Sequence, residues 1–180
     1  SRGVAASGTG LSEDEVVVPL LRLGDHHLSD VEATRTPADL DVAPLLGMSA
    51  LGRHRCRFRF AACELELADT AASHSDGWFD LDLHTAGQPS MVVHFGDLAV
   101  NACWDTGAGL TAVDTGFARA HPELFTPLRA SVGIDASGVE ISSDIAIMAA
   151  CSIGDVEFPE TACALVDLSG MNRILNAGKI

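Results

Sequence analysis

Short runs in which apolar and polar residues alternate, with turn residues between them, are the feature that most restricts the fold of this chain. Phe58 and Phe60 alternate with arginines, and Leu65 and Leu67 alternate with glutamates. Alternation with a period of two is typical of half-buried β-strands, because successive side chains of a strand point to opposite faces. Similar strand-like runs lie at residues 15–23, 28–34, 55–67, 78–83, 91–95, 98–104, 141–153 and 156–168. The sequence therefore predicts a mostly β fold.

Helices are expected to be few and short. Residues 115–121 favour one, with Asp114 as its N-cap and Pro122 at its end, and residues 170–176 favour another. Gly24-Asp25 is a turn signal between two predicted strands. We expect the following apolar side chains to be largely buried: Leu20, Leu23, Leu45, Leu46, Val92, Val100, Ala102, Ile147 and Ile153.

Composition and charge exclude several classes of protein. The chain has 180 residues, of which 47% are apolar, so a hydrophobic core is expected and disorder of the whole chain is not. The formal net charge of −14 gives a surface that repels nucleic acid and anionic membranes, so neither is expected as a partner. The sequence has no uninterrupted apolar run of about 18 residues, so no membrane-spanning helix is predicted.

The cysteines and histidines show no metal-binding pattern. The five cysteines include no CxxC pair, and the seven histidines lack the spacing of metal ligands. A phosphate-binding glycine loop, a dinucleotide fingerprint and a Gly-x-Ser-x-Gly elbow are also missing from the sequence. We therefore expect neither a metal site nor an organic cofactor.

The motif with the clearest chemical meaning is Asp105-Thr106-Gly107-Ala108, which follows the apolar run 98–104 and precedes the apolar run 110–113. A strand, then Asp-Thr-Gly-Ala, then an apolar run resembles the catalytic loop of the retropepsin and pepsin families of aspartic proteases. The resemblance implies a closed β-barrel acid-protease lobe with few short helices. It also implies that Asp105, Thr106 and Gly107 are catalytic, and that Ala108 and Gly109 contact substrate.

The residue types of this loop suit that chemistry. An Asp at a tight turn after a buried strand is held in a low-dielectric cleft, and Gly107 lets backbone N–H groups approach its carboxylate. Thr106 offers a hydroxyl that can bond to a matching loop, and Ala108 is small enough to pack beneath the site. The second Asp-Thr-Gly, at residues 114–116, leads into the predicted helix and is interpreted as its cap instead.

A second motif, Leu45-Leu46-Gly47, is similar to the segment that ends a lobe in these families and passes beside the Asp-Thr-Gly loop. Here it precedes Asp105, whereas within one family lobe it follows the catalytic loop. Two arrangements explain this order: a chain that starts late in one lobe and runs through most of the next, or a permuted single unit. The first arrangement gives a partial first lobe at residues 1–67, a linker at 68–77 and a second lobe at 78–180.

An internal repeat at an offset of 130 residues favours the first arrangement. Leu23-Gly24-Asp25 corresponds to Ile153-Gly154-Asp155, and the apolar runs before each Gly-Asp also correspond. The same offset places residues 7–10 and 136–138 in equivalent glycine-rich hairpins. By the resemblance such a hairpin is a flap over the substrate cleft, so Ser137 and Gly138 are predicted to contact substrate.

The resemblance implies an aspartic endopeptidase that hydrolyses peptide bonds through a water activated by two aspartates sharing one proton. Its substrate would be a peptide or protein. The sequence supplies one clear catalytic loop, so the second aspartate is expected from a homodimer or from a missing N-terminal lobe segment. The alternative is a catalytically inactive binding or regulatory module, since a fold does not fix a function.

Overall fold

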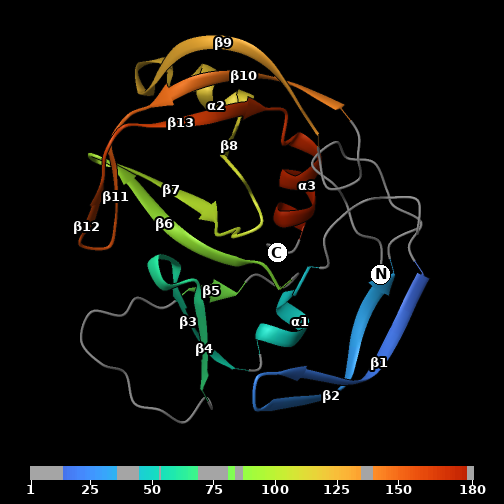
Figure 1. Cartoon of the computed structure of the whole chain (residues 1–180). Coiled ribbons are helices and arrows are strands. Elements are labelled where there is room, and N and C mark those ends of the chain that lie inside the picture. The colour runs from blue at the N-terminus through green and yellow to red at the C-terminus, as the bar shows by residue number, and fades with distance from the viewer. Residues whose placement is uncertain are drawn as a thin grey trace. The chain divides into compact units, whose positions relative to one another are not determined.

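The computed structural model describes residues 14–35, 45–52, 54–68, 81–83, 87–134 and 140–177 (Figure 1). The chain divides into two compact units, one within residues 13–80 and the other within residues 81–180. Strands make up most of the described residues, so the prediction of a mostly β chain with few short helices is confirmed. Apart from Ala68, the predicted linker at 68–77 lies outside the described residues.

The first unit begins with a long antiparallel hairpin of β1 (Asp14–Leu23) and β2 (His26–Arg35). Its turn is the predicted Gly24-Asp25, where Gly24 has a φ of +58°, a conformation that favours glycine. The short helix α1 (Met48–Leu51) covers this hairpin. Its Ala50 packs with Leu28 and Val31, and these three residues form the buried core of the unit.

A second hairpin in the first unit pairs β3 (Arg55–Arg59) with β4 (Glu64–Ala68), joined by the 3₁₀ turn η1 (Phe60–Ala62). One face carries ion pairs, with Arg57 at 3.3 Å from Glu66 and Arg59 at 2.9 Å from Glu64. The apolar residues between them point to the other face. The alternation in the sequence at 55–67 therefore corresponds to a hairpin with one charged and one apolar face.

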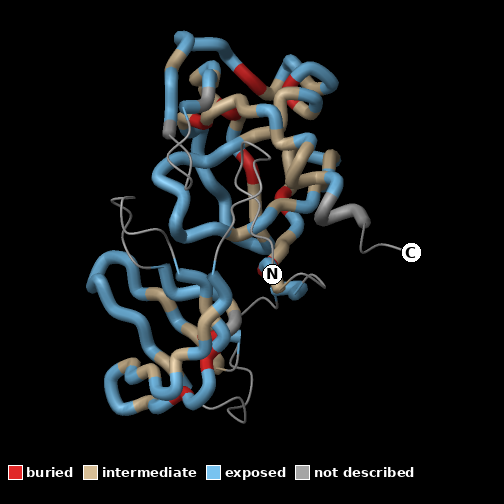
Figure 2. The backbone as a smooth tube through the Cα atoms, turned by 90° about the vertical axis from the view of Figure 1, so that its right-hand side faces the viewer, coloured by how far each residue is buried: buried red, intermediate tan, exposed pale blue. Residues whose placement is uncertain are grey.

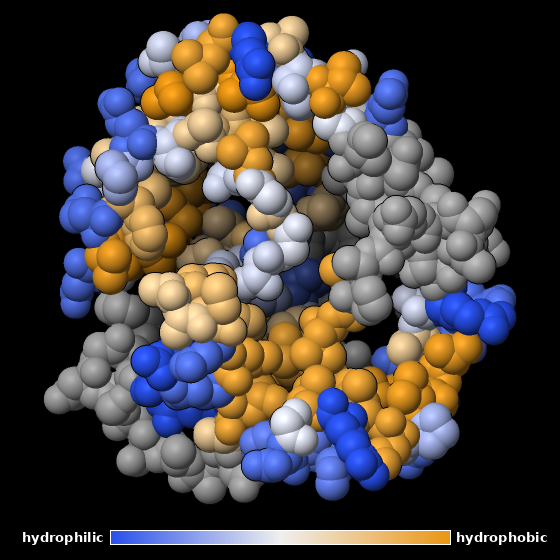
Figure 3. Space-filling view, viewed as in Figure 1, coloured by the Kyte–Doolittle hydropathy of each residue, from blue (hydrophilic) through white to orange (hydrophobic). Residues whose placement is uncertain are grey.

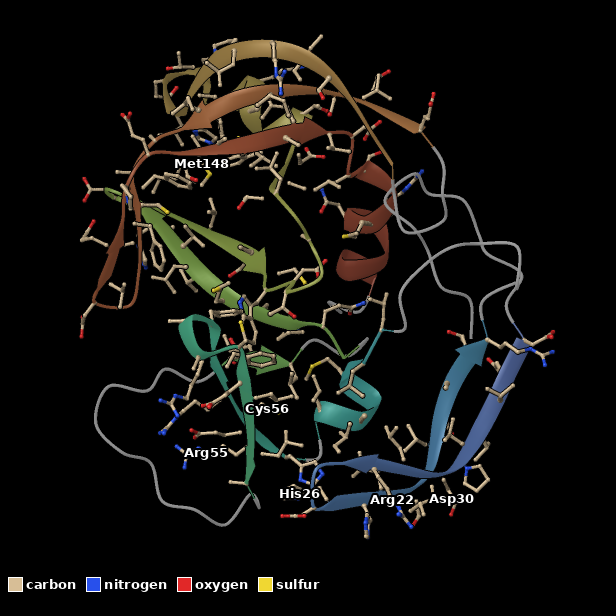
Figure 4. The ribbon with its side chains drawn as sticks, viewed as in Figure 1. Arg22, His26, Asp30, Arg55, Cys56 and Met148 are labelled. Carbon is tan, nitrogen blue, oxygen red and sulfur yellow. The ribbon has the colours of Figure 1, made fainter. Side chains whose placement is uncertain are left out.

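A histidine pair connects the two hairpins of this unit. The rings of His26 and His54 meet edge to face with their centroids 5.2 Å apart, and Nε2 of His26 lies 3.2 Å from the carbonyl oxygen of Leu67 on β4. Figure 4 shows His26 at the β1–β2 turn and Cys56 on β3. Both ring nitrogens of His54 are buried, and neither has a hydrogen-bond partner within the described part of the chain.

The second unit contains two sheets. One has the strand order β8-β13-β10-β9, and the other has the order β12-β11-β6-β5 with β7 paired to β6. The strands are β5 (Asp82–Leu83), β6 (Pro89–Phe95), β7 (Leu98–Cys103), β8 (Thr111–Asp114), β9 (Phe125–Ile134), β10 (Glu140–Met148), β11 (Cys151–Ile153), β12 (Val156–Phe158) and β13 (Thr161–Val166). The helical segments are α2 (Thr115–Ala120), the 3₁₀ turn η2 (Pro122–Leu124) and α3 (Ser169–Ala177), so both predicted helices are confirmed.

The core of the second unit is built by residues from both sheets and from α2 (Figure 2). Its buried members are Val93, Ala118, Phe125, Ala146, Met148, Cys151 and Cys163. The Met148 side chain is on the side of β10 that faces β6 (Figure 4). Small residues at Ala146 and Cys163, both with no exposed surface, let the two strands that carry them lie close to the facing sheet.

Two expectations about this architecture are wrong. The described strands form four separate sheets with open edges, so the closed β-barrel predicted from the resemblance is not formed. Alternation predicts strands, but it does not say whether the first and last strands of a sheet pair with each other. Several side chains predicted to be buried are exposed: Leu45 by 80%, Leu20 by 47%, Val92 by 43% and Leu46 by 37%.

The exposed Val92 has a simple cause. Val93 is buried, so its neighbour on β6 must point to the opposite face of the strand. The other five predicted core residues are half-buried: Leu23, Val100, Ala102, Ile147 and Ile153. The apolar pair Leu45-Leu46 has no role in the core of the described residues, and nothing in the structure explains it.

The predicted repeat is present in the strand register. The hairpin of the first unit and the strands β10 to β13 of the second unit turn at Gly24 and Gly154, whose φ values are +58° and +57°. Residues that pair across the strands of the first unit have counterparts, 130 positions later, that pair across the strands of the second. The pairs are Leu23 with His26 and Ile153 with Val156, Leu21 with Leu28 and Cys151 with Phe158, Val18 with Val31 and Met148 with Thr161, and Val16 with Ala33 and Ala146 with Cys163.

Candidate active site

The Asp105 loop, residues 104–110, connects β7 to β8 in the second unit. The N–H of Trp104 donates to the carbonyl oxygen of Pro89 at 2.9 Å, which continues the β6–β7 pairing past the end of β7. The chain then turns at Thr106 and Gly107 and enters β8 at Thr111. Asp105 therefore stands immediately beyond a paired hairpin, as the sequence predicts.

The carboxylate of Asp105 is oriented by its own loop. The N–H of Gly107 donates to Oδ1 of Asp105 at 2.8 Å, so a backbone N–H does approach the carboxylate. A Cβ at position 107 would lie 3.2 Å from the same oxygen, which is tighter than most contacts of this kind. A larger residue at position 107 would therefore make the exposed Asp105 carboxylate shift by a few tenths of an ångström.

The surroundings of Asp105 differ from the low-dielectric cleft that the sequence predicts. All five predicted site residues of the loop, residues 105–109, are exposed in the structure. A carboxylate in water is solvated on several sides, so within this chain the loop does not provide the dry environment that strengthens catalytic electrostatics. Ser137 and Gly138, predicted to contact substrate, lie outside the described residues.

The charge of Asp105 affects the pKa of the neighbouring Cys103 thiol. Burial raises the pKa of the Cys103 thiol, and the negative charge of Asp105 raises the pKa further. Both effects disfavour the thiolate, because the first removes solvent from the charged form and the second places a like charge beside it. A thiol held in its neutral form is a poor nucleophile, so Cys103 is not suited to be the reacting group of this loop.

Asp114 accepts hydrogen bonds from three backbone N–H groups in the second unit. Its Oδ1 accepts the N–H groups of Gly116 at 2.8 Å and Phe117 at 3.2 Å, which confirms its role as the N-cap of α2. Its Oδ2 also accepts the N–H of Leu168 at 3.0 Å, just after β13. β8 and β13 run parallel and pair along Thr111–Asp114, so Asp114 joins the ends of both strands to the start of the helix.

The contact with Leu168 is the structural detail that sequence analysis missed. The capping signal is local and can be read from Asp114-Thr115-Gly116. Leu168, which donates to Asp114, is 54 residues away in the sequence. No pattern in the sequence predicts the parallel pairing of β8 with β13 that brings the two residues together. A single sequence therefore showed the helix cap but not its link to the strand beside it.

An open polar cleft of about 400 Å³ lies at the start of α2. It is lined by Asp114, Thr115, Gly116, Arg119, Ser142, Asp167 and Ser169, and Asp105 is not part of its lining. Hydrogen bonds from the backbone N–H and the hydroxyl of Ser169 lower the pKa of Asp167, so that carboxylate stays ionised. The cleft therefore combines acidic groups with one arginine and has no dry apolar wall.

No group of three or more His, Cys, Asp or Glu side chains within the described residues could hold a metal ion. None of the described helices is long and apolar enough to cross a membrane. Comparisons with protein-family models, with curated proteins and with solved structures found no match for this chain.

Proposed function

We propose that this chain contributes one aspartate, Asp105, to an aspartic endopeptidase site. The observation that carries the proposal is the Asp-Thr-Gly loop itself, which follows a paired hairpin and directs a backbone N–H at the carboxylate. Retropepsin-like and pepsin-like lobes, which the sequence resembles at residues 105–108, use a loop of this kind. In such a lobe the fold would be that of an acid protease, with the substrate bound as an extended strand.

The proposed chemistry needs two facing carboxylates that share one proton, because like charges at such a short distance cannot both ionise. The ionised carboxylate takes a proton from a water held between them, and the water oxygen attacks the scissile carbonyl carbon. The protonated carboxylate donates a hydrogen bond to the carbonyl oxygen. No metal or organic cofactor takes part in this reaction.

Because Asp105 is exposed, the proposed catalytic site must be completed from outside the second unit. A lone carboxylate in water is ionised at neutral pH and lacks the proton-sharing partner. A two-fold related copy of the loop, or a second Asp-Thr-Gly segment, would both remove water and supply that partner. We therefore expect the 180-residue chain to be inactive as a monomer.

The test is hydrolysis of unstructured peptides at acidic and neutral pH, with the mass of the protein in solution measured alongside. Asp105→Asn should abolish any cleavage while the fold is retained, whereas Asp114→Asn, a matched change in the second Asp-Thr-Gly, should leave cleavage in place. Cleavage that survives Asp105→Asn and is lost with Asp114→Asn would reverse the assignment. Asp105-dependent cleavage by a proven monomer would show that a second carboxylate lies within this chain.

A binding or regulatory module is the second candidate, and the exposure of residues 105–109 is the observation that favours it. Such a module would bind an extended peptide without cutting it. Titration of peptides onto the protein, followed by mass spectrometry of the recovered peptides, separates the two functions. Saturable binding with intact peptides, unchanged by Asp105→Asn, would favour the module.

A further inference from the structure

The repeat in strand register allows the two units to be compared position by position. In the second unit, β10 pairs on one side with β13 and on the other side with β9. Phe125 of β9, Val93 of β6 and Ala118 of α2 complete the core against β10 and β13. The outer side of β13 is paired with β8, the strand that follows the Asp105 loop. The strands equivalent to the first-unit hairpin are therefore enclosed on both edges and on one face.

The equivalent hairpin of the first unit is left open. Within the described residues β1 pairs only with β2, so its outer edge has no strand beside it. We call the side that bears Val16, Val18, Leu21 and Ala33 the β1–β2 face. These four are half-buried, whereas the residues 130 positions later, Ala146, Met148, Cys151 and Cys163, are buried.

The opposite side of β1 is also apolar and uncovered. Val17, 59% exposed, and Leu20, 47% exposed, alternate with Val16, Val18 and Leu21 and therefore lie on the side opposite the β1–β2 face. Figure 3 shows apolar side chains gathered over α1 and the β1–β2 hairpin. An isolated two-stranded hairpin is marginally stable in water, and an unpaired edge strand is a template for pairing with another strand. Val18, Leu21 and Leu23 pack against the cluster of Leu28, Val31 and Ala50 of α1 but stay half-buried, and Val16 and Ala33 lie outside that cluster.

We infer that the β1–β2 face and the outer edge of β1 bind a half-lobe with the pattern of residues 81–130. Its last strand would lie antiparallel to β1, as β9 lies along β10, and its apolar strands would cover Val16 and complete the burial of Val18 and Leu21, which α1 leaves half-buried. A strand like β8 would pair in parallel with β2, as β8 pairs with β13, and would bring an Asp-Thr-Gly loop with it. A second copy of this chain is not the expected occupant, because its own half-lobe already covers β10 and β13.

The sequence before β1 continues the repeat, which gives the register for a test in which a half-lobe is joined to this chain. Ser1, Gly3, Ala6-Ser7-Gly8, Ser12 and Asp14 recur at the same offset as Ser131, Gly133, Ala136-Ser137-Gly138, Ser142 and Asp144. Ser1 corresponds to Ser131. A copy of residues 81–130 placed directly before Ser1 would therefore be followed by the first unit in the same way that residues 81–130 are followed by residue 131 in the second unit. The inference concerns a surface of the fold and does not rest on the proposed peptidase activity.

The experiment extends the full chain by a copy of residues 81–130 in front of Ser1 and measures amide hydrogen exchange in β1. The matched control carries Val93→Asp and Phe125→Asp in the added copy only, which removes the apolar groups that would cover the face. We expect exchange in β1 to be at least about tenfold slower in the extended chain than in the control. Equal exchange rates in β1 of the extended chain and the control would overturn the inference. Protection of β1 that rises with the concentration of the unextended chain would also overturn it, because a second copy would then be the group that covers the face.

A second measurement needs no extension and applies even where the extended chain does not fold. Val16 and Ala146 occupy the same position in the two units, so Val16→Asp and Ala146→Asp are matched substitutions. In the unextended chain we expect Ala146→Asp to abolish the folding of the second unit and Val16→Asp to lower the melting temperature of the first by only a few degrees, about 5 °C. An equally severe loss from Val16→Asp would show that the face is already closed. Adding Asp105→Asn to either series should change neither result, which separates this inference from the proposed catalysis.

Discussion

Replacing Asp114 by Ala removes the acceptor of three backbone N–H groups at once. Two of them, on Gly116 and Phe117, belong to the first turn of α2, and the third, on Leu168, follows β13. Asp114 is half-buried, so water replaces these bonds only in part. The substitution should therefore destabilise the second unit while leaving the Asp105 loop intact.

The magnitude follows from the separate contacts. Loss of an N-cap costs about 1 kcal/mol, and loss of a partly buried hydrogen bond to a charged acceptor costs about 1.5 kcal/mol. Their sum, about 2.5 kcal/mol, lowers the melting temperature of a unit of this size by roughly 10–20 °C. Asp114→Asn keeps Oδ1 as the helix cap but places an amide opposite the N–H of Leu168, so we expect it to lose about 1.5 kcal/mol.

Heat and urea unfolding of both Asp114 variants, with amide exchange at Phe117 and Leu168, measure these terms. Asp105→Ala is the matched control, because its exposed carboxylate accepts a single N–H from within its own loop, and it should cost no more than about 0.5 kcal/mol. A loss below about 0.5 kcal/mol for Asp114→Ala would refute the role of Asp114 as the joint between α2, β8 and β13. Equal stability of Asp114→Asn and the unaltered protein would refute only the contact with Leu168.

Three further results are expected. Asp105→Asn removes a negative charge that raises the pKa of Cys103, so alkylation of Cys103 at a fixed, mildly alkaline pH should become faster. If the dependence of the alkylation rate on pH is unchanged, the two groups do not interact. His54→Phe should leave stability unchanged or raise it, because the ring contact with His26 is kept and two unpaired ring nitrogens are removed; a loss above about 1 kcal/mol in urea unfolding would mean that a His54 nitrogen is bonded. Gly24→Ala should destabilise the first unit by about 1 kcal/mol through its positive φ alone, since a Cβ there meets no atom within 4 Å, and equal unfolding midpoints would contradict this.

The features that the sequence predicted correctly depend on residues close together in the chain. The hairpin at 55–67 follows from Arg-Phe and Glu-Leu alternation, and the turn at Gly24-Asp25 follows from residues that accept a left-handed backbone. The cap at Asp114 follows from a short side chain placed before a helical run. In each case the physical cause acts within a few residues, so a single sequence contains the whole signal.

The features that the sequence did not predict depend on distant parts of the chain. β9 was missed because Pro127 interrupts its pattern and because most of its side chains are exposed, which leaves little alternation. The burial predicted for Leu45 and Leu46 was wrong because hydrophobicity alone does not say which residues find a partner. For the candidate site, the sequence predicted the loop and the position of Asp105 after a strand, but not that residues 105–109 are exposed.

The parallel pairing of β8 with β13 has a consequence for the order of folding. The bond from Leu168 to Asp114 closes a loop of 54 residues, and loop-closure entropy opposes that contact until the intervening strands have collapsed. The hairpins of the first unit join neighbours in sequence, and hairpins form within about 1–10 μs. Chains rich in distant pairings fold more slowly, so α2 should gain its full protection from solvent exchange last, as a late phase set by the arrival of β13 beside β8.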